Sequence, residues 1–178
     1  MGGAMWVFGY GSLIWDPGFP VAERQVARLT DWHRSFCMRS VHHRGTPYAM
    51  GLVLALDRLA GGHCDGVAFR VAEGAEAATL AVLRERELIS SAYLEALLPV
   101  TLHDGRVQSA LAYVIDPHHV QYCGGLSLDE QARIIAQAVG GRGPNRDYLF
   151  ATAQHLAELG IADPDLDWLA TRVAELPA

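Results

Sequence analysis

The order in which strand-like and helix-like patterns follow one another constrains this fold more than any single motif. As far as Ala72 the chain is rich in β-branched and aromatic residues interrupted by Gly and Pro, which indicates strands joined by turns. From Glu73 the sequence EGAEAATLAVLRERELISSAY is rich in Ala, Leu and Glu, which favour a helix. Two strand-like runs and a helical C-terminal part follow. This order predicts an α+β domain with a mostly antiparallel or mixed, barrel-like sheet flanked by helices.

Local signals set the expected bounds of these elements. Ser127 with Glu130 three residues later predicts a capped helix start, and Gly160 predicts a helix end. The segment HHRGTP at 42–47 predicts a turn, and AGGH at 60–63 predicts a turn between two strands. The expected strands are 6–10, 21–29, 32–39, 50–57, 64–71, 97–102 and 109–115. After the helix that starts at Glu73, the expected helices are 127–139, 147–159 and 163–176.

Length and charge limit the classes of function. The 178 residues suit one domain, which we expect to span residues 1–178. Twenty acidic residues against 14 basic ones give a net charge of −6, so the chain lacks the basic surface that nucleic acids and anionic membranes require. We therefore expect a small molecule as its partner, with no nucleic acid and no membrane.

The sequence also predicts the compartment and the state of the cysteines. The longest nearly apolar run, 48–56, is much shorter than the roughly 20 residues of a membrane-spanning helix. The start lacks the basic flank and cleavage site of a secretory signal, so we expect a cytoplasmic protein. The three cysteines are widely spaced and form no C-x-x-C pair, which predicts reduced thiols and neither a disulfide framework nor a zinc site.

The glycine-rich segment VFGYGSLIW is the first candidate site. It superficially suggests a dinucleotide-binding loop, but the following WDPGFP prevents the helix that such a loop requires. It also differs from the G-x-S-x-G pattern of a serine nucleophile, because Ser12 has no Gly two residues later. Two readings remain. The loop turns backbone N–H groups toward an anion or a carbonyl oxygen, or it is a plain tight turn.

A carboxylate is the second candidate. At about 100° per residue, Glu87 projects between Leu80 and Leu83 on its helix, whereas Glu85 points the opposite way. Burial on this apolar stripe would raise the pKa of Glu87 toward the range of a neutral-pH acid and base. The alternative is a solvated helix end in which neighbouring Arg and Glu residues form weak surface pairs.

Four segments, in the same order, resemble the ChaC family of glutathione-directed γ-glutamylcyclotransferases. They are WVFGYGSLIW, HRGTP at 43–47, LRERELISSAY at 83–93 and GPNRDYLFATAQHLAELGIAD at 143–163, and they cover the chain nearly end to end. The resemblance implies the γ-glutamylcyclotransferase-like fold. It implies cleavage of glutathione to 5-oxoproline and Cys-Gly, with no cofactor. It also implies that Glu87 is the catalytic acid and base.

The residues expected to bind the substrate lie in the matching segments. The resemblance assigns substrate binding to the glycine-rich loop, residues 9–14. Arg44, Tyr93 and Tyr148 are weaker candidates, because an ordinary turn cation or a core aromatic residue explains them equally well. The adjacent pairs His42–His43 and His118–His119 lack metal-ligand spacing, so no metal is expected. The expected substrate-binding residues are Gly9, Tyr10, Gly11, Ser12, Leu13, Ile14, Arg44, Tyr93 and Tyr148.

One departure from the family leaves the substrate open. Where family members carry Gly shortly before the residue matching Tyr93, this chain has Ser90-Ser91-Ala92. The bulkier run would narrow a pocket or change the preference among γ-glutamyl compounds. One alternative is a cyclotransferase for other γ-glutamyl-amines or γ-glutamyl-amino acids, because the same loop and the same Glu serve any leaving amine. Two further alternatives are a non-catalytic γ-glutamyl-binding domain and a hydrolase that uses Ser12.

Overall fold

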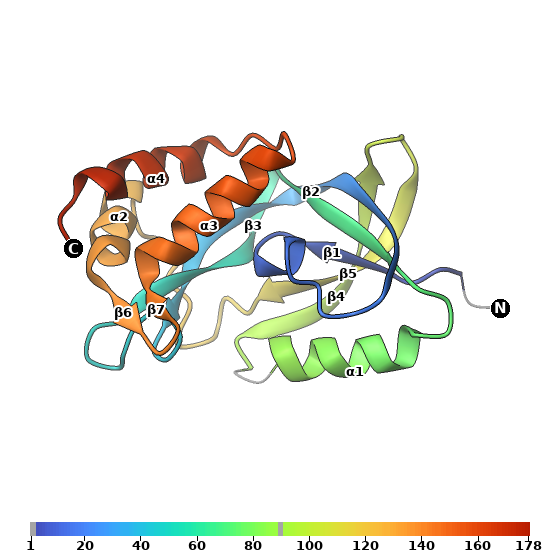
Figure 1. Cartoon of the computed structure of the whole chain (residues 1–178), viewed down its shortest axis with the longest axis horizontal. Helices are drawn as coiled ribbons and strands as arrows, with labels where there is room; N and C mark the ends of the chain where they lie inside the picture. The colour runs from blue at the N-terminus through green and yellow to red at the C-terminus, as the bar shows by residue number, and fades with distance from the viewer. Residues whose placement is uncertain (1–2, 89–90) are drawn as a thin grey trace. The chain divides into compact units, whose positions relative to one another are not determined.

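The computed structural model describes residues 3–88 and 91–178 (Figure 1). The strands are β1 (Trp6–Gly9), β2 (Val21–Ser40), β3 (Gly51–Val71), β4 (Tyr93–Leu102), β5 (Val107–Ile115), β6 (Val139–Gly140) and β7 (Gly143–Pro144). The helices are the short 3-10 helix η1 (Ser12–Ile14) and the α-helices α1 (Glu76–Glu87), α2 (Leu128–Gln137), α3 (Asn145–Glu158) and α4 (Pro164–Glu175).

The chain divides by its internal contacts into two compact units. Unit 1 consists of Met1–Arg34 and Leu56–His119, and unit 2 consists of Ser35–Ala55 and Val120–Ala178. The expectation of a single domain over residues 1–178 stays a prediction.

Five strands form a closed barrel in the order β1-β3-β2-β4-β5, with a further pairing of β3 with β5. β1 is antiparallel to β3 and parallel to β5, whereas β4 and β5 form a long antiparallel hairpin that runs from Tyr93 opposite Ile115 to Thr101 opposite Val107. Closing the sheet leaves these strands no unpaired edge. The predicted barrel-like, mixed sheet is therefore confirmed.

Two of the barrel strands are longer than the sequence predicts. β2 includes both 21–29 and 32–39, and β3 continues through the AGGH segment that was expected to be a turn. Asp31 and Gly61 have positive φ angles of 70° and 79°, and the Gly61 N–H donates to Asp31 Oδ1 at 3.0 Å. These two residues distort the strands locally, and the pairing of the strands continues around them.

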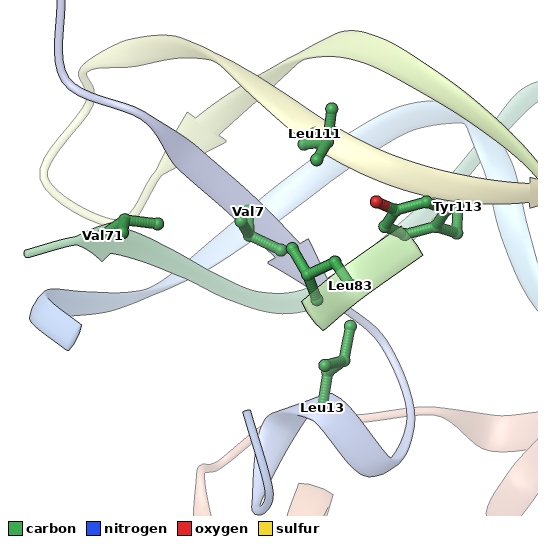
Figure 2. Close-up of a cluster of buried hydrophobic side chains, with 6 residues drawn as sticks. All are labelled: Val7, Leu13, Val71, Leu83, Leu111 and Tyr113. Carbon is green, nitrogen blue, oxygen red and sulfur yellow. The ribbon is translucent and has the colours of Figure 1, made fainter. Parts of the chain in front are cut away.

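The core of unit 1 joins α1 to the barrel. Leu83 of α1 is fully buried and lies between Val7 of β1 and Leu13 of η1 (Figure 2). Val71, Leu111 and Tyr113 complete the cluster, and Leu80 packs against it from the same helix. Burying side chains of this size contributes about 1.5–3 kcal/mol each. The cluster therefore fixes α1 against the barrel and brings it close to η1.

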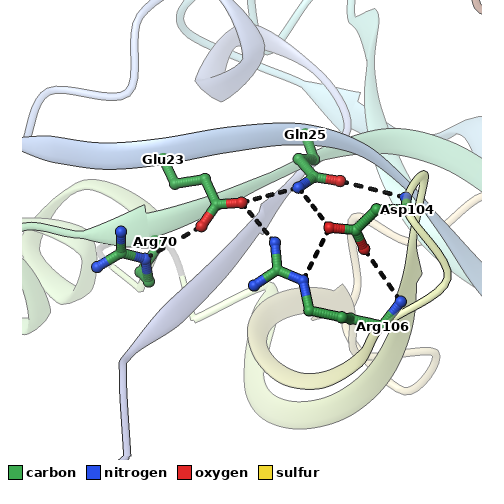
Figure 3. Close-up of polar contacts among 5 residues, drawn as sticks. All are labelled: Glu23, Gln25, Arg70, Asp104 and Arg106. Carbon is green, nitrogen blue, oxygen red and sulfur yellow. Dashed lines mark hydrogen bonds and ion pairs between the residues drawn. The ribbon is translucent and has the colours of Figure 1, made fainter.

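A polar network connects three parts of the barrel surface (Figure 3). Gln25 of β2 donates to both Glu23 at 2.7 Å and Asp104 at 2.9 Å. Arg106 pairs with the same two carboxylates, and Arg70 of β3 pairs with Glu23. The hydrogen bonds from Gln25 and Arg106 hold the pKa values of Glu23 and Asp104 below their usual range.

This network predicts a loss of stability in acid. A carboxyl whose pKa is lowered by folding stabilises the native state above its unfolded pKa, of about 4, and loses that contribution as the pH falls through the folded pKa. In the double variant Glu23→Gln, Asp104→Asn, we expect the free energy of unfolding to fall less steeply than in the wild type as the pH drops below the ordinary carboxyl pKa of about 4. Urea unfolding across this pH range measures it. An unchanged slope in the variant would contradict the prediction.

The helices of unit 2 begin and end where local signals place them. Ser127 caps α2 with the expected capping box, in which the Glu130 N–H donates to Ser127 Oγ at 3.1 Å and the Ser127 N–H donates to Glu130 Oε2 at 3.0 Å. Asp163 caps α4 with its side chain, which accepts from the Leu166 N–H at 3.1 Å, and Gly160 ends the preceding helix with a φ of 72°. The three C-terminal helices pack against one another.

Main-chain contacts hold the segment between β2 and β3 in unit 2. A Cβ atom added to Gly45 would lie 2.1 Å from the Gly51 nitrogen, and one added to Gly140 would lie 2.4 Å from the Gly45 nitrogen. Asn145, at the start of α3, is fully buried. It accepts from the Leu52 N–H and donates to the Leu52 carbonyl, both at 2.8 Å. This side chain therefore continues the hydrogen bonding of β3.

Candidate active site

The glycine-rich loop begins where β1 ends, in unit 1. A Cβ atom at Gly9 would lie 3.1 Å from Leu13 Cβ, so the chain turns back closely on itself here. The Ile14 N–H donates to the Gly11 carbonyl at 2.9 Å, and the Asp16 N–H donates to the Ser12 carbonyl at 2.9 Å. The segment after β1 is therefore a tight turn with a single short 3-10 helix, and the long helix of a dinucleotide-binding loop is absent from it.

Two contacts from the barrel fix the first carbonyl groups of this loop. The buried Arg34 donates through Nε to the Tyr10 carbonyl at 2.7 Å. A Cβ atom at Gly66 would lie 2.3 Å from the Gly9 carbonyl oxygen, so only glycine fits there. The path of the loop is thus set by the barrel beneath it.

Glu87 is the last residue of α1, on the helix face that contacts the core. Its side chain is 16% exposed, Leu83 one turn earlier is fully buried, and Glu85 is exposed. The predicted place of Glu87 on an apolar stripe is therefore confirmed. Burial raises the pKa of Glu87 above its usual value, and the positive charge of Arg86 opposes this shift. The arrangement provides a carboxyl group that gains and loses a proton more readily near neutral pH.

Arg86 links this carboxylate to the glycine-rich loop. Its Nη2 donates to Ser12 Oγ at 2.9 Å, and its Nη1 donates to the Asp16 carbonyl at 2.7 Å. Its Nε lies 3.5 Å from Glu87 Oε1. The sequence indicated no more than a weak surface pair for Arg86, although this residue immediately precedes Glu87.

Tyr113 of β5 is a second residue whose place near Glu87 the sequence did not predict. Its hydroxyl donates to Glu95 Oε1 at 2.9 Å, and Arg84 of α1 binds both oxygens of the same carboxylate. Burial, followed by the hydrogen bond to Glu95, holds the pKa of Tyr113 well above its usual range, and the charge of Glu87 acts in the same direction. Tyr113 therefore stays protonated. Tyr93 packs against the same cluster.

Arg44 and Tyr148 form a second group of predicted residues, in unit 2. The Arg44 guanidinium lies 5.6 Å from the centre of the Tyr148 ring and donates to the carbonyl groups of Arg142 and Pro144 at 3.0 and 3.2 Å. The Tyr148 hydroxyl accepts from the Leu54 N–H at 3.4 Å. Both side chains thus have structural contacts of their own. Unit 1 brings together the remaining predicted residues, which are the loop from Gly9 to Ile14, Glu87 and Tyr93.

The run before Tyr93 is described in part. Ser90 lies outside the described residues, whereas Ser91 is exposed and has a φ of 55°, in the left-handed region. Glycine occupies this region with little strain, and a residue with a side chain costs about 1–2 kcal/mol there. A glycine before this tyrosine, as the resemblance implies for the family, would therefore relieve strain at this turn.

We expect Ser91→Gly to be more stable than Ser91→Ala by about 1 kcal/mol, because only glycine adopts the left-handed conformation without strain. The exposure of Ser91 makes the pair a direct comparison of backbone conformation. Thermal unfolding of the two variants measures the difference. Equal stabilities would show that the backbone at this position is not strained.

Within residues 3–88 and 91–178, no group of three or more His, Cys, Asp and Glu side chains has the geometry to hold a metal ion. None of the helices in the same ranges has the length and apolarity needed to cross a membrane.

Comparison with known proteins gives consistent results over nearly the whole chain. Residues 5–176 match the family model of the ChaC-like proteins. The glutathione-specific γ-glutamylcyclotransferase of Escherichia coli is 39% identical over 176 residues, which cover 99% of this chain and 75% of the relative. γ-Glutamylcyclotransferase 2-3 of Arabidopsis thaliana is 34% identical over 179 residues, which cover 97% of this chain and 90% of the relative.

A solved structure shows the same fold. The glutathione-specific γ-glutamylcyclotransferase from yeast superposes with a TM-score of 0.87 at 23% identity, covering 99% of this chain and 98% of its own. With the family model matched from residue 5 to residue 176 and two relatives above 30% identity, this chain belongs to the ChaC-like family.

Proposed function

We propose that this protein is a glutathione-specific γ-glutamylcyclotransferase that cleaves glutathione to 5-oxoproline and Cys-Gly. Relatives at 39% and 32% identity, from Escherichia coli and Schizosaccharomyces pombe, carry the name of this activity. The observation in the structure that best supports the proposal is the buried carboxylate of Glu87, whose pKa is raised by burial beside the glycine-rich loop. A carboxyl group of this kind is suited to accept and return a proton.

The reaction requires no nucleophilic side chain. The free α-amine of a γ-glutamyl compound lies a few bonds from its own γ-carbonyl, so a folded substrate forms a five-membered ring by intramolecular attack. Holding the two groups together is worth about 7–11 kcal/mol of the barrier. The new C–N bond closes the ring, and the bond to the departing amine breaks. Glu87 accepts a proton from the α-ammonium group before the attack and returns it to the departing amine. The ring nitrogen releases its second proton to solvent after the C–N bond has formed.

The glycine-rich loop would hold the reacting carbonyl group. Negative charge develops on the γ-carbonyl oxygen during attack, and backbone N–H groups of residues 10–13 are the proposed donors to it. Arg44, which belongs to unit 2, stays a prediction as a substrate-binding residue.

The contacts of Ser12 argue against a serine hydrolase. Its hydroxyl accepts from the Arg86 guanidinium. Guanidinium keeps its protons in proteins and cannot act as the base that activates a serine. Identifying the reaction products by mass tests the same alternative, because hydrolysis releases free glutamate and cyclisation releases 5-oxoproline.

Incubation with glutathione, γ-glutamyl-alanine and γ-glutamyl-lysine, followed by mass spectrometry of the products, tests the proposal. We expect 5-oxoproline from glutathione and little from the other two compounds. Turnover of another γ-glutamyl compound in preference to glutathione would move the substrate to that compound. Free glutamate as the product, or no turnover of any of the three, would contradict the proposed reaction.

A further inference from the structure

Arg86 contacts both the glycine-rich loop and the proposed catalytic carboxylate. The two terminal nitrogens of its guanidinium bind Ser12 and Asp16, at the two ends of the turn that follows β1, while Nε faces Glu87. A planar guanidinium is suited to this, because its donors diverge in fixed directions. One side chain therefore sets the position of the loop relative to the last turn of α1.

These contacts differ from those of an ordinary surface arginine. The Arg86 side chain is 29% exposed, whereas Arg84 on the same helix is 54% exposed and pairs with Glu95 of β4. The chain also approaches Arg86 closely at Gly18, where a Cβ atom would lie 3.6 Å from Nη1 and φ is 76°. The loop thus wraps around the guanidinium.

The bond from Arg86 also determines how the Ser12 hydroxyl is used. A hydroxyl group carries one proton and accepts through its lone pairs. Because Ser12 Oγ accepts from Arg86 Nη2, its own proton points away from the guanidinium. The hydroxyl is therefore oriented as a donor to a third group, such as a carboxylate or carbonyl oxygen of a bound substrate.

We propose that Arg86 is a positioning residue that holds the Ser12–Asp16 turn against Glu87 and orients the Ser12 hydroxyl as a donor to the substrate. This inference rests on the proposed cyclotransferase function. It adds a residue that acts through Ser12 and Glu87 and does not itself react.

The charges around Glu87 determine what the loss of Arg86 would do. On α1, the positive charge of Arg86 lowers the pKa that burial raises. On β5, the Tyr113 hydroxyl is protonated and neutral, and it is held by Glu95, which Arg84 neutralises. The Tyr93 side chain of β4 packs against the same core cluster as Leu83. Removing the charge of Arg86 should therefore let the pKa of Glu87 rise further.

Two substitutions separate the charge of Arg86 from its shape. Arg86→Gln removes both, so we expect kcat/KM for glutathione to fall by about tenfold or more, and the acid limb of its pH profile to move to higher pH. Arg86→Lys keeps the charge but lacks the planar guanidinium. We expect the acid limb of its pH profile to lie at the wild-type pH, while its KM stays above the wild-type value.

Two readouts do not depend on turnover. Carbon-13 NMR titration of Glu87 should show a higher pKa in Arg86→Gln and a nearly unchanged one in Arg86→Lys. Amide hydrogen exchange at Asp16, whose N–H donates to the Ser12 carbonyl, should be faster in both variants. A wild-type protein that cyclises no γ-glutamyl compound would refute the proposed function and leave these two measurements able to test the position of the loop.

Arg84→Gln is the matched control, since it removes a charge and two hydrogen bonds from the same helix without touching the loop. We expect amide exchange at Asp16 in this variant to match that of the wild type, because the hydrogen bonds of Arg84 go to Glu95 of β4 and not to the Ser12–Asp16 turn. The proposal is overturned if Arg86→Gln leaves the titration and the exchange unchanged, or if Arg84→Gln changes the exchange at Asp16 equally. A wild-type KM in Arg86→Lys would contradict the claim that the planar guanidinium is required to hold the loop.

Discussion

Replacing Glu87 by Gln is expected to abolish cyclisation and to make the protein more stable at neutral pH. The amide cannot accept the proton of the α-ammonium group, and removing a general acid and base costs about 100- to 10,000-fold in rate. The substitution preserves the size of the side chain, which is largely buried against the core. Turnover of glutathione and urea unfolding of the same preparation measure the two effects together.

The gain in stability follows from the direction of the pKa shift. Burial raises the pKa of Glu87 above that of the unfolded chain, so the native state keeps its proton over a pH window in which the unfolded state has lost it. Stability therefore falls as the pH rises through this window, and above it the ionised carboxylate is a cost to the fold. Glu87→Gln should remove this decrease of stability with pH. The variant should therefore be about as stable as the wild type in acid and more stable than the wild type at neutral pH.

Glu85→Gln provides the control, because Glu85 lies on the same helix and is exposed. We expect it to retain wild-type turnover and the wild-type dependence of stability on pH. Near-normal turnover in Glu87→Gln would refute the catalytic assignment. An inactive Glu87→Gln that is also less stable at neutral pH would refute the account of a costly buried charge.

The largest loss of stability is expected for Asn145→Ala. The side chain is fully buried, and its two hydrogen bonds satisfy both polar groups of the Leu52 backbone. Alanine would leave those groups buried without their partner, at about 1–3 kcal/mol each, and would add a small cavity. We expect a loss of about 3 kcal/mol, which corresponds to a fall of roughly 10 °C in Tm. Calorimetry measures it.

Gln154→Ala is the comparison for this variant. Gln154 is an amide on the same helix, but it is exposed and donates to the exposed Glu158, at 3.2 Å. We expect its effect to stay within about 0.5 kcal/mol. If the two variants lost similar stability, the effect of Asn145→Ala would reflect helix propensity and not the bonds to Leu52.

The helical part of the fold was predictable because its signals are local. The cap at Ser127 with Glu130 and the start at Asp163 lie next to the residues that they cap, and both appear in the structure. The strand pattern was less informative. Asp31 and Gly61 lay in the gaps expected between strands, yet each strand continues past them because pairing with neighbouring strands compensates for one distorted residue.

The candidate site also combines residues with local sequence signals and residues whose contacts are distant in the chain. The burial of Glu87 follows from helix periodicity with Leu83, so the sequence predicts it. Arg34, Arg86 and Tyr113 were missed because their roles depend on partners far away in the chain, such as the Tyr10 carbonyl and Glu95. A pair of arginines two residues apart gives no local sign that one binds the loop and the other a strand.

The backbone contacts of Gly45, Gly51 and Gly140 limit how the segment between β2 and β3 can be changed. Since main chain packs directly on main chain at these three positions, any side chain there displaces the segment that carries Arg44. Tyr48 in the same segment is fully exposed. A library designed to alter substrate preference through this segment therefore has to keep the glycines and the segment's length and vary the exposed positions alone.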